Sequence, residues 1–271
     1  MLLPKQSRNY VTGLAAACSL LLIACSPEEV RQVNLIPKPE QMTMTGGTFT
    51  VDSLALFGGQ SSRNIKTVID EAWSGNPEGY QLDVTPGGID LRAGSPDGLF
   101  YGMQTLRQLY AGGEVPCVSI RDNPRFGYRG LHLDVSRHFF SKEEVMKLLT
   151  DAGGWRIEID KYPKLTSETA FRTESDWRKW WDGRDRKYLP EGTPGAYGGY
   201  YTKEDIREIV KHAASKHINI IPEIEFPGHS EEVLMAYPEL SCSGKPYRNG
   251  DFCIGNEQSF TFMEDVLAEV I

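Results

Sequence analysis

Three short stretches of the chain concentrate polar side chains that could transfer protons or hold a ligand. YRGLHLDVSRHFF places His132 and Asp134 on one face of a predicted strand. TDAGGWRIEID supplies Asp151, and PEIEFPGHS supplies Glu225 and then His229. Carboxyl and imidazole groups act as acids and bases and bind hydroxyl groups. Any one of them alone would more often be a buried ion pair or a hydrogen-bonded core histidine, so the surrounding elements decide their meaning.

Those surrounding elements alternate between strand and helix after a boundary near Arg125. Such alternation predicts parallel strands covered by helices. In a βα barrel the carboxyl ends of the strands carry the site, and the three polar stretches stand at such ends. The predicted elements are strands over 130–135 and 218–226, helices that begin with capping boxes at Ser141–Glu144 and Thr202–Asp205, and a last helix over 259–271.

The preceding residues predict a smaller α+β domain. YQLDVTPGGIDLRAG indicates two short strands around a Pro-Gly-Gly turn, SPDGLFYGMQTLRQLY has helical spacing, and EVPCVSIRD returns to strand. With 271 residues and 40% apolar content, the chain can bury a real core. We therefore expect three regions: a signal peptide at 1–25, an α+β domain at 26–125 and a partial barrel at 126–271.

The N-terminus indicates export. Lys5 and Arg8 precede an apolar run, 11–24, that is too short for a permanent membrane span. The run ends in Leu-Ile-Ala-Cys, which resembles a bacterial lipobox, so Cys25 is expected to be acylated and to become the first residue. The alternative is an ordinary cleaved signal. The lipobox predicts a lipid-anchored protein of the bacterial cell envelope, on the outer membrane or the periplasmic side.

Export also affects how the other cysteines are interpreted, because exported proteins meet an oxidising compartment. Cys242 and Cys253 flank the turn-rich loop SGKPYRNGDF and are disulfide candidates. Cys117 lies in an apolar, strand-like run and is expected to be a buried thiol. The net charge of −8, without any run of lysine or arginine, argues against a nucleic-acid partner.

Longer motifs resemble a known family. RGLHLDVSRHFFSKEEV, GGWRIEIDKYPKLT, GYYTKEDIREIVKHAASKHINIIPEIEFPGHS and YPELSC are similar to successive signatures of the family 20 glycoside hydrolases, the β-N-acetylhexosaminidases. LIPKPEQ and GLFYGMQTLRQL resemble their N-terminal domain. The resemblance implies an α+β domain followed by a (β/α)8 TIM barrel, removal of terminal β-linked N-acetylglucosamine or N-acetylgalactosamine from glycans, and no cofactor or metal.

The resemblance also assigns roles to residues. It implies that Arg129 holds hydroxyls of the terminal sugar, and that Asp151 and His229 support the catalytic acid through hydrogen bonds. The implied mechanism is substrate-assisted: the 2-acetamido oxygen attacks the anomeric carbon, an aspartate orients the acetamido group, and the adjacent glutamate protonates the leaving oxygen.

The resemblance places this Asp-Glu pair just beyond the helix that ends at Ile271, so we expect no catalytic carboxylate within the chain. The only Asp-Glu dipeptide of the sequence is Asp70-Glu71, in the N-terminal domain. Glu264-Asp265 has the reverse order and lies in a predicted helix. The barrel segment therefore supplies supporting and binding residues without the pair that performs the chemistry.

The barrel segment is also short. MKLL runs directly into TDAGGW, where about twenty residues of helix, turn and strand are expected in a βα repeat. A complete barrel needs about 250 residues, and 126–271 offers roughly half of that. We therefore predict a shortened copy or fragment of a hexosaminidase that is inactive by itself. Trp177, Trp180 and Trp181 lie in a charged insertion and are interpreted as packing or surface aromatics.

Two alternatives stay open at this point. The first is a lipid-anchored, glycan-binding remnant that uses Arg129 and His229 without catalysis. The second is an iron site of two histidines and one carboxylate, formed by His132, Asp134 and His229. The strand–helix alternation favours the barrel over the all-β setting that would suit such an iron site.

Overall fold

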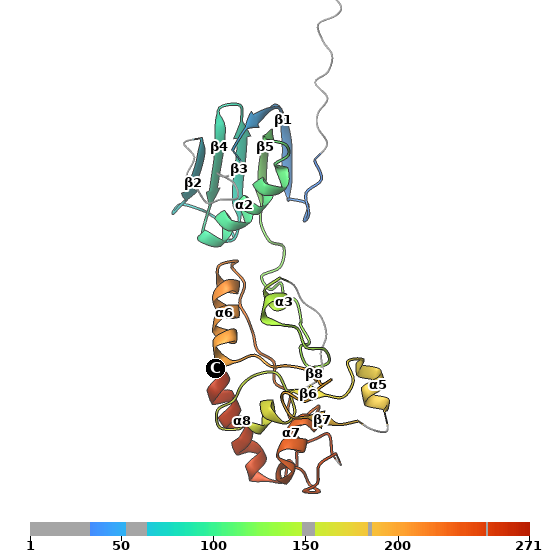
Figure 1. Cartoon of the computed structure of the whole chain (residues 1–271). Helices are drawn as coiled ribbons and strands as arrows, with labels where there is room; N and C mark the ends of the chain where they lie inside the picture. The colour runs from blue at the N-terminus through green and yellow to red at the C-terminus, as the bar shows by residue number, and fades with distance from the viewer. Residues whose placement is uncertain (1–32, 53–63, 148–154, 184–185, 248) are drawn as a thin grey trace, which may run out of the picture. The chain divides into compact units, whose positions relative to one another are not determined.

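The computed structural model describes residues 33–52, 64–147, 155–183, 186–247 and 249–271. They form two compact units that divide between Gly127 and Tyr128 (Figure 1). Cys25 and Asp151 lie outside the described residues. None of the helices within these ranges is long and apolar enough to cross a membrane.

In its described residues, the first unit is a five-stranded sheet with one helix packed on it (Figure 1). The strand order is β1-β5-β3-β4-β2, and every pair is antiparallel except β2 with β4. The hairpin of β3 and β4 turns at Pro86-Gly87, which confirms the prediction of two strands there. The elements are β1 (Gln41–Thr50), β2 (Ile65–Ile69), β3 (Tyr80–Thr85), β4 (Gly88–Ala93), α2 (Pro96–Leu109) and β5 (Glu114–Asp122).

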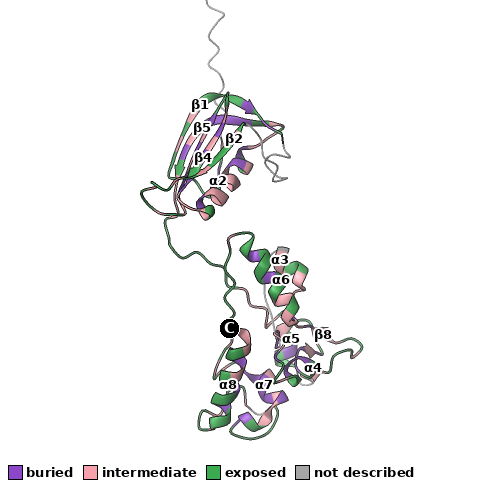
Figure 2. Cartoon of the chain, turned by 90° about the vertical axis from the view of Figure 1, so that its left-hand side faces the viewer, coloured by how far each residue is buried: buried purple, intermediate pink, exposed green. Residues whose placement is uncertain are grey.

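Helix α2 lies in the stretch whose spacing predicts a helix. The Ser95 hydroxyl accepts a hydrogen bond from the Gly98 amide at 3.3 Å, and Pro96 occupies the first turn. Gly102 faces the sheet so closely that a Cβ there would lie 2.4 Å from the Leu91 side chain. Leu91 and Leu106 are fully buried in the core between the helix and the sheet. Figure 2 shows buried residues, in purple, on α2 and on the strands.

The second unit has short elements around a separate core. That core contains Trp155, Leu165, Val233, Phe262 and Val266. The elements are α3 (Lys142–Lys147), α4 (Lys164–Ser167), β6 (Phe171–Arg172), α5 (Trp177–Asp182), β7 (Tyr188–Leu189), β8 (Tyr197–Gly198), α6 (Lys203–Ala214), α7 (Glu231–Ala236), the 3-10 helix η1 (Pro238–Leu240) and α8 (Glu257–Val270).

The predicted helix starts are present. The Ser141 amide donates to the Glu144 carboxylate at 2.8 Å, and the Glu144 amide donates to the Ser141 hydroxyl at 3.3 Å. Thr202 and Asp205 form the corresponding reciprocal pair at the start of α6. Local side-chain chemistry therefore fixes both starts, as the capping boxes predicted.

The prediction of two barrel strands, at 130–135 and 218–226, is wrong. Segments 130–135 and 218–226 are irregular, and part of their apolar surface is exposed, 66% for Leu131 and 71% for Ile221. A parallel strand depends on hydrogen bonds to neighbouring strands and on helices over its faces. Among the described residues of this unit, the single parallel pairing is the bridge between Ile157 and Tyr201. Without paired neighbours these apolar runs do not become strands.

Cys242 and Cys253 form a disulfide with their Cα atoms 4.7 Å apart, whereas Cys117 is a buried thiol in β5. Closing a loop between residues 11 apart stabilises the fold by about 3 kcal/mol in the chain-entropy model. We predict that peptide mapping without reduction recovers the two loop cysteines as one cross-linked species. Recovery of two alkylatable thiols there would contradict the pairing.

Candidate functional site

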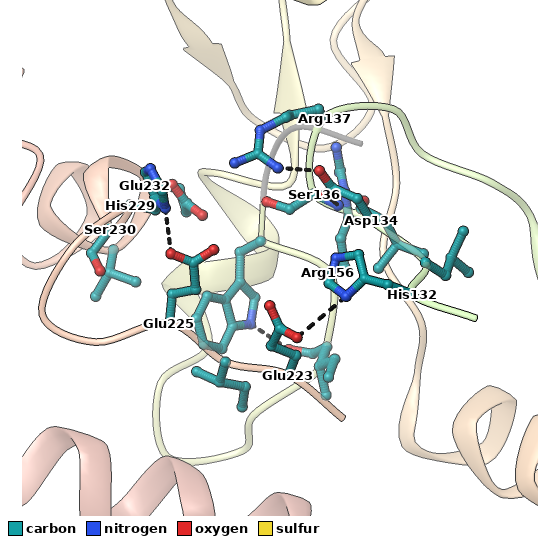
Figure 3. A pocket seen from close by; sticks show the side chains of 16 residues that line it. His132, Asp134, Ser136, Arg137, Arg156, Glu223, Glu225, His229, Ser230 and Glu232 are labelled. Atoms are coloured by element: carbon teal, nitrogen blue, oxygen red, sulfur yellow. Dashed lines mark hydrogen bonds and ion pairs between the residues drawn. The ribbon is translucent and has the colours of Figure 1, made fainter. Parts of the chain in front are cut away.

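A cavity of about 140 Å³ lies in the second unit where the predicted barrel strands would end. It brings the first and third polar stretches of the sequence together, and the second stretch contributes Trp155, Arg156 and Ile157 (Figure 3). The cavity is lined by residues 132–137, 155–157, 223–225, 229, 230, 232 and 233.

Ion pairs between described residues cross or border the cavity (Figure 3). His132 Nδ1 lies 3.3 Å from the Glu223 carboxylate, which links the first stretch to the third. His229 Nδ1 contacts the Glu225 carboxylate, and Arg137 contacts the Asp134 carboxylate. Because these side chains are mostly half-exposed or more, the pairs orient polar groups toward the cavity rather than stabilise the fold strongly.

This pairing does not support the iron-site alternative. His132, Asp134 and His229 each contact a different partner. Within the described ranges no group of three histidine, cysteine, aspartate or glutamate side chains is arranged to hold a metal ion. The spacing in the sequence allowed such a site, but the fold directs the three side chains into separate pairs.

The side chain of Arg156, a residue that lines the cavity, connects three backbone segments. Its side chain is 4% exposed and donates to the carbonyl oxygens of Val135 at 2.9 Å, Ala170 at 2.5 Å and Gly199 at 2.7 Å. Burial lowers the pKa of the guanidinium to about 10, and the positive charge of Arg172 adds to the fall. Arg156 thus stays charged at neutral pH and fixes three segments that are distant in the sequence.

Glu232, on α7, is a carboxyl of the cavity that titrates near neutral pH. Burial raises its pKa to about 7, the neighbouring Glu231 adds to the rise, and Arg156 and Arg137 oppose it. Desolvation therefore outweighs the attraction of the two guanidinium groups. A carboxyl with such a pKa exchanges its proton near neutral pH.

The raised pKa predicts a pH-dependent cost to folding. Below the ordinary carboxyl pKa of 4.5 both the folded and unfolded states hold the proton, and no cost arises. Between pH 4.5 and 7 the unfolded state releases the proton first, so stability falls as pH rises, by at most about 3 kcal/mol. We predict that Glu232→Gln is more stable than the wild type at pH 8 and equal to it at pH 4.5, in urea unfolding.

The matched control for this measurement is Glu239→Gln, which changes an exposed glutamate of η1. This control should have a free energy of unfolding within about 0.5 kcal/mol of the wild type at both pH values. A Glu232→Gln variant whose advantage is equal at pH 4.5 and pH 8 would contradict the raised pKa.

The other predicted site residues have different fates. His229 lines the cavity with a left-handed backbone, φ 50°, which is uncommon for a non-glycine residue. Arg129 is exposed, lies in an irregular segment and is not among the cavity-lining residues, so the structure does not place it in the site. Asp151 lies outside the described residues.

The sequence alone did not identify Arg156 and Glu232 as site residues. Charged residues inside the apolar runs WRIEI and SEEVLMA were a usable signal for both.

The end of α8 is not part of the cavity either. Ile271 follows the last residue of this helix, is 95% exposed and does not line the cavity. The reversed pair Glu264-Asp265 is engaged elsewhere on α8, where the Asp265 carboxylate accepts from the Tyr162 hydroxyl at 2.7 Å and pairs with Lys161 at 2.5 Å. The described cavity therefore contains no adjacent Asp-Glu pair, and the position of that pair beyond Ile271 stays a prediction.

Comparisons with known proteins agree on one family. The model for glycosyl hydrolase family 20, catalytic domain, matches residues 126–271, and the model for domain 2 of that family matches residues 58–123. A beta-hexosaminidase of Porphyromonas gingivalis is 34% identical over 336 residues, which covers 97% of this chain and 41% of the relative. That alignment is longer than the 271-residue chain, so the relative has residues without a counterpart here; where they fall is not part of the match, and the internal gap stays a prediction.

Solved structures share the fold. The exo-β-N-acetylglucosaminidase of Vibrio harveyi in complex with N-acetylglucosamine has a TM-score of 0.71 and 30% identity, covering 87% of this chain and 44% of that one. A β-N-acetylhexosaminidase of Bacteroides fragilis has a TM-score of 0.70 and 28% identity, covering 87% and 54%.

This chain thus spans less than half of the Porphyromonas relative and about half of the solved structures. The similarity nevertheless runs through both of its units, and the catalytic-domain match alone covers more than half of the chain. The fold is accordingly α/β, an incomplete (β/α)8 barrel preceded by an α+β unit, and the chain belongs to glycosyl hydrolase family 20.

Proposed function

We propose that this chain forms one side of the terminal-sugar site of a β-N-acetylhexosaminidase. Such an enzyme removes terminal β-linked N-acetylglucosamine or N-acetylgalactosamine from a glycan or oligosaccharide. The observation that carries the proposal is the cavity in the catalytic-domain segment, where His229, Glu225 and Arg137 converge. Relatives named beta-hexosaminidase and a neighbour in complex with N-acetylglucosamine support the substrate class.

The proposed chemistry is substrate-assisted retaining hydrolysis. The sugar's own acetamido oxygen attacks its anomeric carbon, so no carboxylate of the protein serves as nucleophile. An aspartate holds the acetamido group, and a glutamate protonates the leaving oxygen. Water, deprotonated by the same glutamate, then opens the cyclic intermediate and releases the sugar. These 271 residues supply groups that bind and orient the sugar, and the Asp-Glu pair is not among their barrel residues.

Sugar binding tests the proposal without requiring turnover. N-acetylglucosamine should bind the purified chain in calorimetric titration, and glucose, which lacks the acetamido group, should bind more weakly. His229→Ala should weaken binding, because Glu225 then loses its partner at the cavity edge. His217→Ala is the control, since His217 has a similar left-handed backbone, φ 56°, and does not line the cavity. Equal binding of both sugars, or of neither, would contradict the proposal.

The alternative is a glycan-binding protein without catalysis. The same cavity favours it, because its polar residues can bind a sugar although the barrel segment has no Asp-Glu pair. Binding of the sugar without hydrolysis, in the longest polypeptide that the gene encodes, would establish this alternative over the enzyme.

Attachment to the cell envelope is also part of the proposal. It rests on the charged start, the apolar run and the Leu-Ile-Ala-Cys sequence, since Cys25 lies outside the described residues. We predict that intact-mass analysis of the membrane fraction shows diacylated Cys25 as the first residue. A mature protein cut elsewhere and without lipid would remove the anchor.

A further inference from the structure

Helix α5, drawn in yellow in Figure 1, carries three tryptophans in two turns. Trp180 is 2% exposed and anchors the helix, whereas Trp181 is 47% exposed. The Trp177 ring lies between them, with centroid distances of 5.5 Å to Trp180 and 5.1 Å to Trp181. One indole is thus presented at the surface by two others that pack behind it.

Two arginines hold this aromatic group in place. The Arg172 guanidinium lies 5.6 Å from the ring centroids of both Trp177 and Trp180, and Arg186 lies 4.5 Å from that of Trp181. Arg172 also donates to the carbonyls of residues 174 and 175 just before the helix. Cation–π contacts and these hydrogen bonds order the exposed ring before any ligand arrives, which reduces the entropy lost on binding.

The aromatic group is linked to the cavity through the same two arginines. Arg186 forms an ion pair with Glu231 at 3.0 Å, and the residues on either side of Glu231, at 230 and 232, line the cavity. On the other side, Arg172 donates to the Arg137 carbonyl at 3.0 Å, and Arg137 also lines the cavity. Two arginines thus connect the aromatic group on α5 to residues in or next to the cavity wall.

We propose that Trp181 forms an accessory saccharide-binding surface for a sugar ring beyond the one held in the cavity. A pyranose has an apolar face of C–H groups and polar hydroxyls at its rim. A flat, ordered and half-exposed indole stacks on that face, while neighbouring charged groups such as Lys179, 72% exposed, bind hydroxyls. This inference rests on the proposed function for the terminal sugar, and it assigns an oligosaccharide rather than a single sugar as the ligand.

Indole NMR tests the two sites separately. The five tryptophans give five side-chain N–H signals, which single Trp→Phe variants assign. Trp155 lines the cavity and reports on the terminal sugar, while Trp181 reports on α5. The ¹⁵N-labelled chain is titrated with N-acetylglucosamine and with chitotriose. We expect both ligands to shift the Trp155 signal and only chitotriose to shift the Trp181 signal.

Affinity supplies the second measurement. Chitotriose should bind about 3- to 10-fold more tightly than the monosaccharide, the gain expected from one stacked ring. Trp181→Ala should abolish this gain and leave monosaccharide binding unchanged. The control, Phe260→Ala on α8, removes an aromatic ring of similar exposure, 42%, and should retain the gain.

Each outcome has one meaning. A Trp155 shift without a Trp181 shift, or a gain that survives in Trp181→Ala, overturns the accessory surface and leaves the proposed function intact. A Trp181 shift by chitotriose without a Trp155 shift supports the surface and contradicts the sugar site in the cavity. No shift at either indole overturns both.

Discussion

A purified polypeptide of these 271 residues should release no product above background from an aryl N-acetylglucosaminide. The barrel segment, which runs to Ile271, holds no Asp-Glu pair, so the leaving oxygen departs unprotonated. Losing general acid catalysis alone slows such a step by about 10²- to 10⁴-fold. The acetamido group also loses the aspartate that would align it and stabilise the positive intermediate. These losses act on the same transition state and compound.

The aryl substrate is the most permissive choice, because its good leaving group needs little protonation. Arg129→Ala distinguishes true activity from a contaminant, since it removes the residue that the resemblance assigns to sugar hydroxyls. Hydrolysis by the 271-residue polypeptide that disappears in Arg129→Ala would show that the catalytic groups lie within this sequence, and the proposed requirement for an Asp-Glu pair would be wrong.

Replacing Arg156 with alanine should destabilise the second unit by about 3–5 kcal/mol. The Ala170 carbonyl still accepts a hydrogen bond from the Gly199 amide at 3.2 Å. The change therefore removes the Arg156 donor from the buried carbonyl of Gly199 and the half-buried carbonyl of Val135, and it leaves a void where the side chain was. The substitution also removes the desolvation cost of a buried positive charge, which offsets part of the destabilisation. The loss of three hydrogen bonds is the larger effect.

Tryptophan fluorescence in urea measures this effect in the right unit, because four of the five tryptophans belong to residues 128–271. Arg207→Ala is the control: Arg207 lies on α6 with its side chain 68% exposed, in a surface ion pair, and should change stability by less than about 0.5 kcal/mol. An Arg156→Ala variant that unfolds with the control would show that the three carbonyls do not depend on the guanidinium.

The parts of the fold that the sequence predicted are those determined by neighbours along the chain. The Ser141 and Thr202 capping boxes begin α3 and α6, and Pro86-Gly87 turns the β3–β4 hairpin. Each signal involves residues within a few positions of one another, so the pattern of letters is sufficient.

The failures involve partners that are distant in the sequence. The apolar run 218–226 has strand composition, but composition cannot report whether neighbouring strands are present, and the run is irregular, with Ile218, Ile220 and Ile221 exposed. Arg156 resembled an ordinary strand residue because its acceptors lie 14 to 43 residues away. Of the candidate site, the polar stretches of His132 and His229 could be predicted to meet, while the pairs that they form could not.

The strand order of the first unit affects how its sheet assembles. β1 precedes the other described strands in the sequence, yet within the described sheet it pairs only with β5, the last strand of that unit. Until β5 is in place, β1 lacks this partner and the sheet keeps an open edge beside β3. Joining strands some seventy residues apart carries a large loop-closure cost and slows folding. The first unit therefore completes its sheet only when its last strand joins its first.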